Sequence, residues 1–113
     1  MTKDRRGMFH LDVLIEKENN HYTAHCLQFD LVADGKTKES AKKNIMDVIV
    51  EYICFAYRNN WEKFVFKPAP QEYWEKLCCS RPESPGRIER KIKGVPLKRL
   101  IEEVDFNRVV TYA

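Results

Sequence analysis

Two alternating segments joined by a tight turn constrain this chain more than any other feature of its sequence. Across residues 8–17, apolar residues occupy every second position, a period that is typical of a half-buried β-strand. Asn19 and Asn20 suit a tight turn, and pairing the chain across them sets Ile15 opposite Ala24. Partners across two strands share a face of the sheet, so this register gathers the apolar residues of both strands together. Register and alternation therefore predict the same β-hairpin.

A third strand and a long helix are predicted after the hairpin. Residues 29–33 form another short apolar run, and Asp34 and Gly35 then indicate a turn. Thr37 is a good helix N-cap, because its hydroxyl can accept an unpaired backbone N–H of the first turn. After it, apolar residues recur at the spacing of one helical face: Ala41, Ile45, Val48, Ile49, Tyr52, Phe55 and Ala56.

The second half of this predicted helix is apolar on more than one side. Glu51 is the one charged residue between Val48 and Phe55. A helix of this kind is covered on more than one face, either by the C-terminal third of the chain or by a second subunit. We expect a homo-oligomer, because so large an apolar girdle is more than one small domain readily hides. The candidate oligomer-interface residues are Ile49, Val50, Ile53 and Cys54.

Shorter elements are predicted for the rest of the chain. Residues 63–67 are a plausible fourth strand, and residues 71–79 a short helix. The segment 81–86, which contains two prolines and a glycine, is a linker by composition. Beyond it we expect a basic strand over residues 87–93, an amphipathic helix over residues 97–104 and a β-prone end.

These elements predict an α+β fold. An antiparallel sheet of three to four strands is expected to pack on one long helix, with a small C-terminal β/α appendage. The linker divides the chain into a core domain, residues 1–80, and a basic strand-helix-strand extension, residues 81–113.

Charge is distributed unevenly along the 113 residues, whose net charge is +3. Residues 1–80 hold 12 Lys and Arg against 12 Asp and Glu, whereas residues 81–113 hold 8 against 5. The candidate contact residues in the basic segment are Arg87, Arg90, Lys91, Lys93 and Arg99. They could contact nucleic acid or an acidic protein partner, or simply keep an exposed edge strand from aggregating.

Several classes of protein find no support in the sequence. No run reaches the roughly 20 apolar residues that a membrane span needs, and no apolar core follows the first basic residues. We therefore expect a cytoplasmic protein without membrane contact. The four cysteines include no Cys-x-x-Cys pair, which argues against a structural zinc site.

A spaced pattern runs through the stretch from Phe9 to Tyr52. Its residues are Glu16, Tyr22, Ala24, Cys26, Leu27, Val32, Ala33, Gly35, Thr37 and Ala41. This pattern resembles the HicB-like antitoxin family. The resemblance implies a β-β-β-α-β core, a truncated ribonuclease H arrangement that lacks nuclease activity.

The resemblance also implies a role. HicB-type proteins bind and silence HicA, a small messenger-RNA-cleaving toxin, and many repress their own operon through a C-terminal DNA-binding module. That module is usually ribbon-helix-helix or helix-turn-helix. This chain departs from the family there, because only one short helix is predicted after Arg87.

Candidate chemical groups in the matching stretch are better explained as surface residues. Asp12 invites comparison with the first carboxylate of a ribonuclease H metal site, but Asp30 and Asp34 have no fixed geometry toward it. His10 and His25 share a face roughly 13 Å apart, which is too far for joint chelation. We expect no catalytic residue, no metal and no cofactor.

The resemblance thus implies a non-enzymatic, HicB-like antitoxin-type protein that engages a partner protein such as a HicA-like RNA-cleaving toxin. One alternative is a nucleic-acid-binding transcriptional regulator that acts through the basic C-terminal segment. Another is a stand-alone oligomeric domain of unassigned role.

Overall fold

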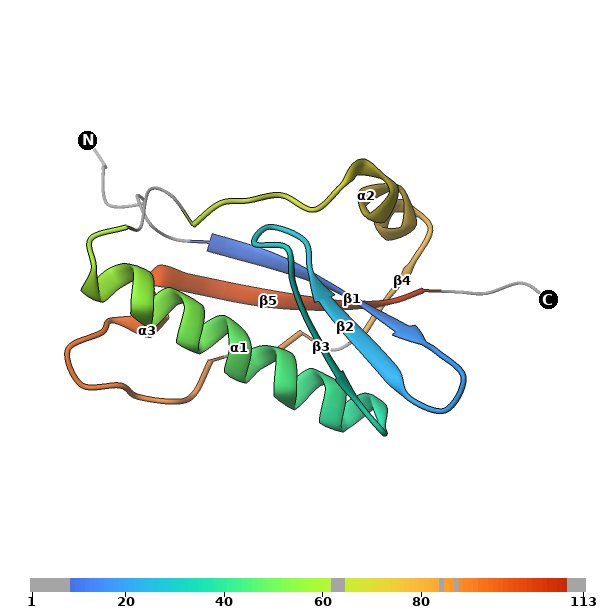
Figure 1. Cartoon of the computed structure of the whole chain (residues 1–113), viewed down its shortest axis with the longest axis horizontal. Coiled ribbons are helices and arrows are strands. Elements are labelled where there is room, and N and C mark those ends of the chain that lie inside the picture. Colours follow the sequence, from blue (N-terminus) through green and yellow to red (C-terminus); the bar gives the residue numbers. More distant parts are fainter. Residues whose placement is uncertain (1–8, 62–64, 84, 87, 110–113) are drawn as a thin grey trace.

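The fold is of the α+β class, with one long helix packed on a five-stranded sheet (Figure 1). The computed structural model describes residues 9–61, 65–83, 85–86 and 88–109. Its elements in chain order are β1 Phe9–Lys17, β2 Tyr22–Cys26, β3 Leu31–Gly35, α1 Lys38–Arg58, α2 Gln71–Cys78, β4 Arg81–Pro82, α3 Leu97–Leu100 and β5 Ile101–Arg108. Among the helices of these residues, none is long and apolar enough to cross a membrane.

The predicted hairpin is confirmed, with the expected register. β1 and β2 are antiparallel, and Ile15 faces Ala24. The Glu18 N–H donates to the His21 carbonyl at 2.8 Å, which closes the turn. β3 pairs antiparallel with the other side of β2, so a third strand forms as predicted, but it spans Leu31–Gly35 rather than residues 29–33, and Asp34 and Gly35 pair within it instead of turning the chain.

The helix α1 begins at the predicted cap. The Thr37 hydroxyl accepts from the Ser40 N–H at 3.1 Å, and the Ser40 hydroxyl accepts from the Thr37 N–H at 3.0 Å. This reciprocal pair is a capping box, which satisfies backbone donors that the first turn leaves unpaired. Ile45 and Ile49 follow on the buried face and pack against the sheet.

The strand β5 changes the predicted sheet. The strand order is β3-β2-β1-β5-β4, and β5 runs parallel to β1. The expected fourth strand is not formed: residues 62–64 lie outside the described part, and residues 65–67 form no strand. Instead, the Lys67 N–H donates to the carbonyl of Gln28 at 2.8 Å. The sheet is therefore mixed rather than antiparallel.

The predicted C-terminal helix ends after about one turn. α3 stops at Leu100, and the chain enters β5 at Ile101. Val104 and Phe106 are buried, while the residues between and beside them are polar. Val104 fits both the helical and the strand spacing, so the local pattern does not decide between them. Pairing with β1 decides for the strand.

The C-terminal third belongs to the same core as α1. Four of its buried side chains join α1 in one hydrophobic cluster: Ile88, Val95, Leu97 and Leu100. The four residues predicted as an oligomer interface are buried in this cluster: Ile49, Val50, Ile53 and Cys54. That prediction is corrected, because the chain itself covers them. A domain boundary was predicted after residue 80. In the structure, β4 and β5 lie beyond that residue but belong to the same sheet as β1, so neither the sheet nor this core is divided there.

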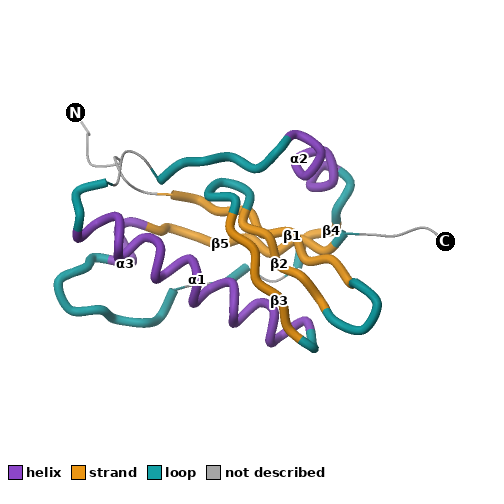
Figure 2. Tube along the Cα trace, in the orientation of Figure 1, coloured by secondary structure: helices purple, strands orange, loops and turns teal. Residues whose placement is uncertain are grey.

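The helix α2 covers part of the opposite face of the sheet (Figure 2). A second, smaller core forms there from Leu14, Leu27 and Ala69 with Tyr73, Trp74 and Leu77 of α2. This packing explains why Leu14 interrupts the polar face of β1. Toward the start of β1, His10 on that face is exposed and Asp12 is half-buried.

Candidate functional site

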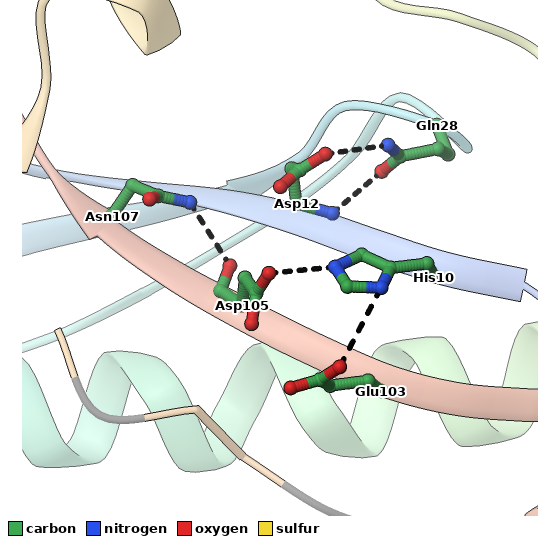
Figure 3. A network of polar contacts seen from close by, with 6 residues as sticks. All are labelled: His10, Asp12, Gln28, Glu103, Asp105 and Asn107. Carbon is green, nitrogen blue, oxygen red and sulfur yellow. Dashed lines mark hydrogen bonds and ion pairs between the residues drawn. The ribbon is translucent and has the colours of Figure 1, made fainter. Parts of the chain in front are cut away.

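The accessible part of this face carries polar side chains from β1 and β5 (Figure 3). Parallel pairing sets His10 beside Glu103 and Asp12 beside Asp105. His10 Nε2 lies 2.6 Å from Asp105 Oδ2, and His10 Nδ1 lies 3.6 Å from Glu103 Oε1. We call these four residues the sheet-face cluster.

Gln28 holds Asp12 in position. The Asp12 N–H donates to Gln28 Oε1 at 2.7 Å, and Gln28 Nε2 donates to Asp12 Oδ2 at 3.0 Å. Gln28 lies in the turn between β2 and β3 and is almost buried. Its two contacts orient the Asp12 carboxylate and tie this turn to β1.

The surrounding carboxylates raise the pKa of His10 above its ordinary value. The hydrogen bond with Asp105 is the largest cause, while partial burial acts in the opposite direction. The negative charges of Asp105, Glu103 and Asp12 raise the pKa further. The cluster thus favours the imidazolium form of His10.

The sheet-face cluster contains the donor types of a divalent-cation site. One ligand atom from each of His10, Asp12 and Asp105 lies within 4.8 Å of the others. A cation would need the neutral imidazole and would replace the hydrogen bond between His10 and Asp105. The raised pKa of His10 opposes that exchange. In this structure the contacts of His10 with Asp105 and Glu103 form an ion-pair network that joins β1 to β5, and the same donor set could hold a divalent cation.

This arrangement corrects the expectation for Asp12. The sequence predicts a solvated Asp12 without a neighbouring carboxylate, whereas Asp105 lies beside it on β5. The alternation of Glu103, Asp105 and Asn107 with buried residues is the signal that could have located the partner. His25 is separate from His10, as predicted, and contacts Asp30 at 2.7 Å.

Replacing His10 with glutamine should cost stability mainly below neutral pH. The folded-state pKa lies above 6.5, the value expected in the unfolded chain. The stabilising contribution is therefore fully present below about pH 6.5 and is lost as pH rises through the raised pKa. Urea denaturation should show the difference between parent and variant shrinking as pH rises above about 6.5 and through the raised pKa of His10. A difference that does not vary with pH, or that His21→Gln reproduces, would contradict the assignment.

The predicted basic contact residues do not line one strand. Arg87 lies outside the described residues, and residues 88–93 form no strand, only an isolated bridge between Ile92 and Val95. The side chains of Lys91, Lys93 and Arg99 are exposed. Arg90 differs from them, because it borders a groove beside α1.

The groove lies between the second half of α1 and residues 90–92, and its volume is about 320 Å³. Its lining residues are Val50, Cys54, Phe55 and Ile92, with the polar residues Glu51, Arg58, Asn59 and Arg90. Phe55 packs edge-to-face against Trp61, with ring centroids 5.5 Å apart. We call this feature the helix groove.

Five residues of the HicB-like pattern have structural positions outside both sites, whereas Val32 of the pattern is 58% exposed. Ala24, Cys26, Leu27 and Ala41 are fully buried, and burial raises the pKa of the Cys26 thiol to about 11. Thr37 caps α1. These residues therefore stabilise the fold.

Comparisons of the chain with protein-family models, with curated proteins and with solved structures found no match.

Proposed function

We propose that this chain is a non-enzymatic binding protein of the HicB-like antitoxin type, acting in the cytoplasm. Its partner in this proposal is a small protein such as a HicA-like RNA-cleaving toxin. The agreement between pattern and fold carries the proposal: β1, β2, β3 and α1 follow one another, and β5 returns beside β1. This order supports the β-β-β-α-β core that the resemblance implies, with β5 rather than residues 63–67 as its last strand.

One surface feature supports binding. The helix groove presents Phe55 and arginine side chains at its rim. Arginine and large aromatic side chains supply much of the binding energy at protein interfaces. An antitoxin inhibits by covering its toxin, so it needs a surface of this kind.

Co-expression with a toxin-sized protein encoded beside this chain tests the proposal. We expect the growth arrest caused by the neighbouring protein alone to be relieved, and the two proteins to elute together in size-exclusion chromatography. The control is the same neighbour expressed with an unrelated protein of similar mass. Unrelieved arrest together with separate elution would contradict the proposal.

A further inference from the structure

We infer that the helix groove docks an acidic segment of a partner protein, which inserts one large apolar side chain between the arginines. This inference rests on the proposed function, because it names the surface and the chemistry by which the partner is held.

The interior of the helix groove is suited to one apolar side chain. Val50 and Cys54 are buried, and Ile92 is half-buried, so the floor is apolar. A volume of about 320 Å³ is at the lower end of the range for binding pockets and suits a leucine or phenylalanine side chain. Phe55 is 56% exposed and Trp61 is 51% exposed. A docked segment would remove both aromatic rings from water.

The charges at the rim select an acidic occupant. Arg58 and Arg90 line the groove against one carboxylate, that of Glu51. Lys91 and Lys93 flank Ile92 along the chain and are exposed. These cations attract a segment that carries carboxylates and repel a basic one.

The contact that Arg90 already makes is easily exchanged. Its Nη1 lies 3.3 Å from Asp47 Oδ1, and both side chains are more than 40% exposed. Ion pairs at such exposed positions contribute little stability, so a partner carboxylate can replace Asp47 at low cost.

Two other occupants fit the rim and floor less well. A second copy docked about a two-fold axis would bring the same basic rim against itself, because the same patch is used on both subunits. A nucleic acid would meet the arginines but would leave the apolar floor without a matching group, since its backbone contacts are polar.

Trp61 supplies a signal for occupancy of the helix groove. The chain contains two tryptophans. Trp74 is a half-buried residue of α2 that packs against the second core, and its Nε1 donates to the Ala69 carbonyl at 3.0 Å. In a Trp74→Phe background, fluorescence therefore reports Trp61 alone.

The probe is a synthetic amphipathic peptide that carries one leucine flanked by glutamates at helical spacing. A second peptide, in which lysines replace these glutamates, is its match. We expect the acidic peptide to shift Trp61 emission saturably, and the basic peptide to bind at least about tenfold more weakly. Added salt should weaken binding of the acidic peptide.

Matched substitutions locate the binding. Phe55→Ser and Arg58→Glu should each weaken binding of the acidic peptide by about tenfold or more. Phe66→Ser is the control for Phe55, because both phenylalanines are 56% exposed and Phe66 does not line the groove. Arg99→Glu makes the same charge change as Arg58→Glu outside the lining residues. Both controls should bind within about twofold of the parent protein.

Several results would overturn the inference. The inference would be contradicted if the acidic and basic peptides bound equally well. It would also be contradicted if Phe55→Ser and Phe66→Ser lost the same affinity for the acidic peptide. Tighter binding of a short RNA duplex would assign the groove to nucleic acid, and self-association abolished by Phe55→Ser would assign it to a second copy.

The toxin assay separates this inference from the proposed function. Growth relief that persists in Phe55→Ser and Arg58→Glu would overturn the groove as the docking site and leave the proposed function in place. Binding of the acidic peptide without any growth relief would support the groove and contradict the antitoxin role.

Discussion

Replacing Gly35 with alanine should lower the free energy of unfolding by more than about 2 kcal/mol. Gly35 ends β3 just before the cap of α1. An added Cβ would lie 2.2 Å from Ser40 Oγ and 2.5 Å from the backbone nitrogen of Ala41. Cβ atoms essentially never approach other heavy atoms so closely, so β3 and the first turn of α1 would have to separate.

The neighbours of Gly35 have little freedom to move. The Ser40 hydroxyl is held in the capping box with Thr37, and caps of this kind contribute about 1 kcal/mol. Ala41 is fully buried, and its N–H donates to the Thr37 carbonyl at 3.0 Å. Relief of the clash therefore breaks the start of α1, its packing on β3, or both.

Urea denaturation measures this effect, and two variants define its cause. Gly94→Ala has open space around the new Cβ but a φ of +80°, so it should cost only about 1 kcal/mol. Adding Ser40→Ala to Gly35→Ala should not restore stability, because the clash with the Ala41 nitrogen remains. A loss of less than about 0.5 kcal/mol in Gly35→Ala would contradict the prediction.

The hairpin and the start of α1 were predictable because their signals are local. The register of Ile15 with Ala24 follows from alternation and a turn within one short stretch, and Thr37 is a cap by its chemistry alone. The same locality places Leu14 on the polar face of β1 and predicts the short helix over residues 71–79, but it gives no sign that this helix, α2, covers Leu14.

The C-terminal third was less predictable because its partners are distant in the sequence. Nothing near Val104 indicates that β1, at the other end of the chain, lies beside it. The cluster of Asp12 with Asp105 depends on this parallel pairing, so it could not be anticipated while residues 97–104 were expected to be helical. The burial of Cys54 and its neighbours depends on the same docking.

The composition of residues 81–86 also led to a wrong prediction, because this segment was expected to be a linker. Prolines and a glycine do interrupt regular structure, but they are also tolerated at the edge of a sheet. Arg81 and Pro82 form β4 at that edge. The Glu83 N–H donates to the Phe106 carbonyl at 2.8 Å, and the Gly86 N–H to the Val104 carbonyl at 2.7 Å. Residues 81–83 and Gly86 of the segment are thus attached to β5.

Glu83 connects this edge to α1. Its carboxylate lies 2.9 Å from Lys38 Nζ, 2.8 Å from Lys42 Nζ and 3.2 Å from Arg108 Nε, and its side chain is only 14% exposed. Burial by itself raises the pKa of this carboxyl. The hydrogen bonds and charges of Lys42 and Lys38 outweigh burial and lower the pKa to about 2. One side chain therefore joins the edge segment, the first turns of α1 and the end of β5.

Replacing Glu83 with glutamine should lower the free energy of unfolding by about 1–3 kcal/mol at neutral pH. The variant keeps the shape of the side chain but leaves Lys38, Lys42 and Arg108 without their shared negative charge. Because the folded-state pKa is lowered from 4.5 to about 2, the contribution is present above about pH 4.5. It is lost as pH falls through about 2, where the carboxyl of the folded parent protein becomes protonated.

Urea denaturation of parent and variant across this window tests the assignment to charge. Glu18→Gln, at an exposed position of the hairpin turn, should stay within about 0.5 kcal/mol of the parent protein throughout. A gap between parent and Glu83→Gln that remains at the acid end would mean that packing, rather than the negative charge, holds the segment. If the difference in unfolding free energy between parent and Glu83→Gln disappears at the acid end, the negative charge of Glu83 is its cause. Lys38 and Lys42 of α1 and Arg108 of β5 then depend on this one carboxylate, which attaches the edge of the sheet to α1.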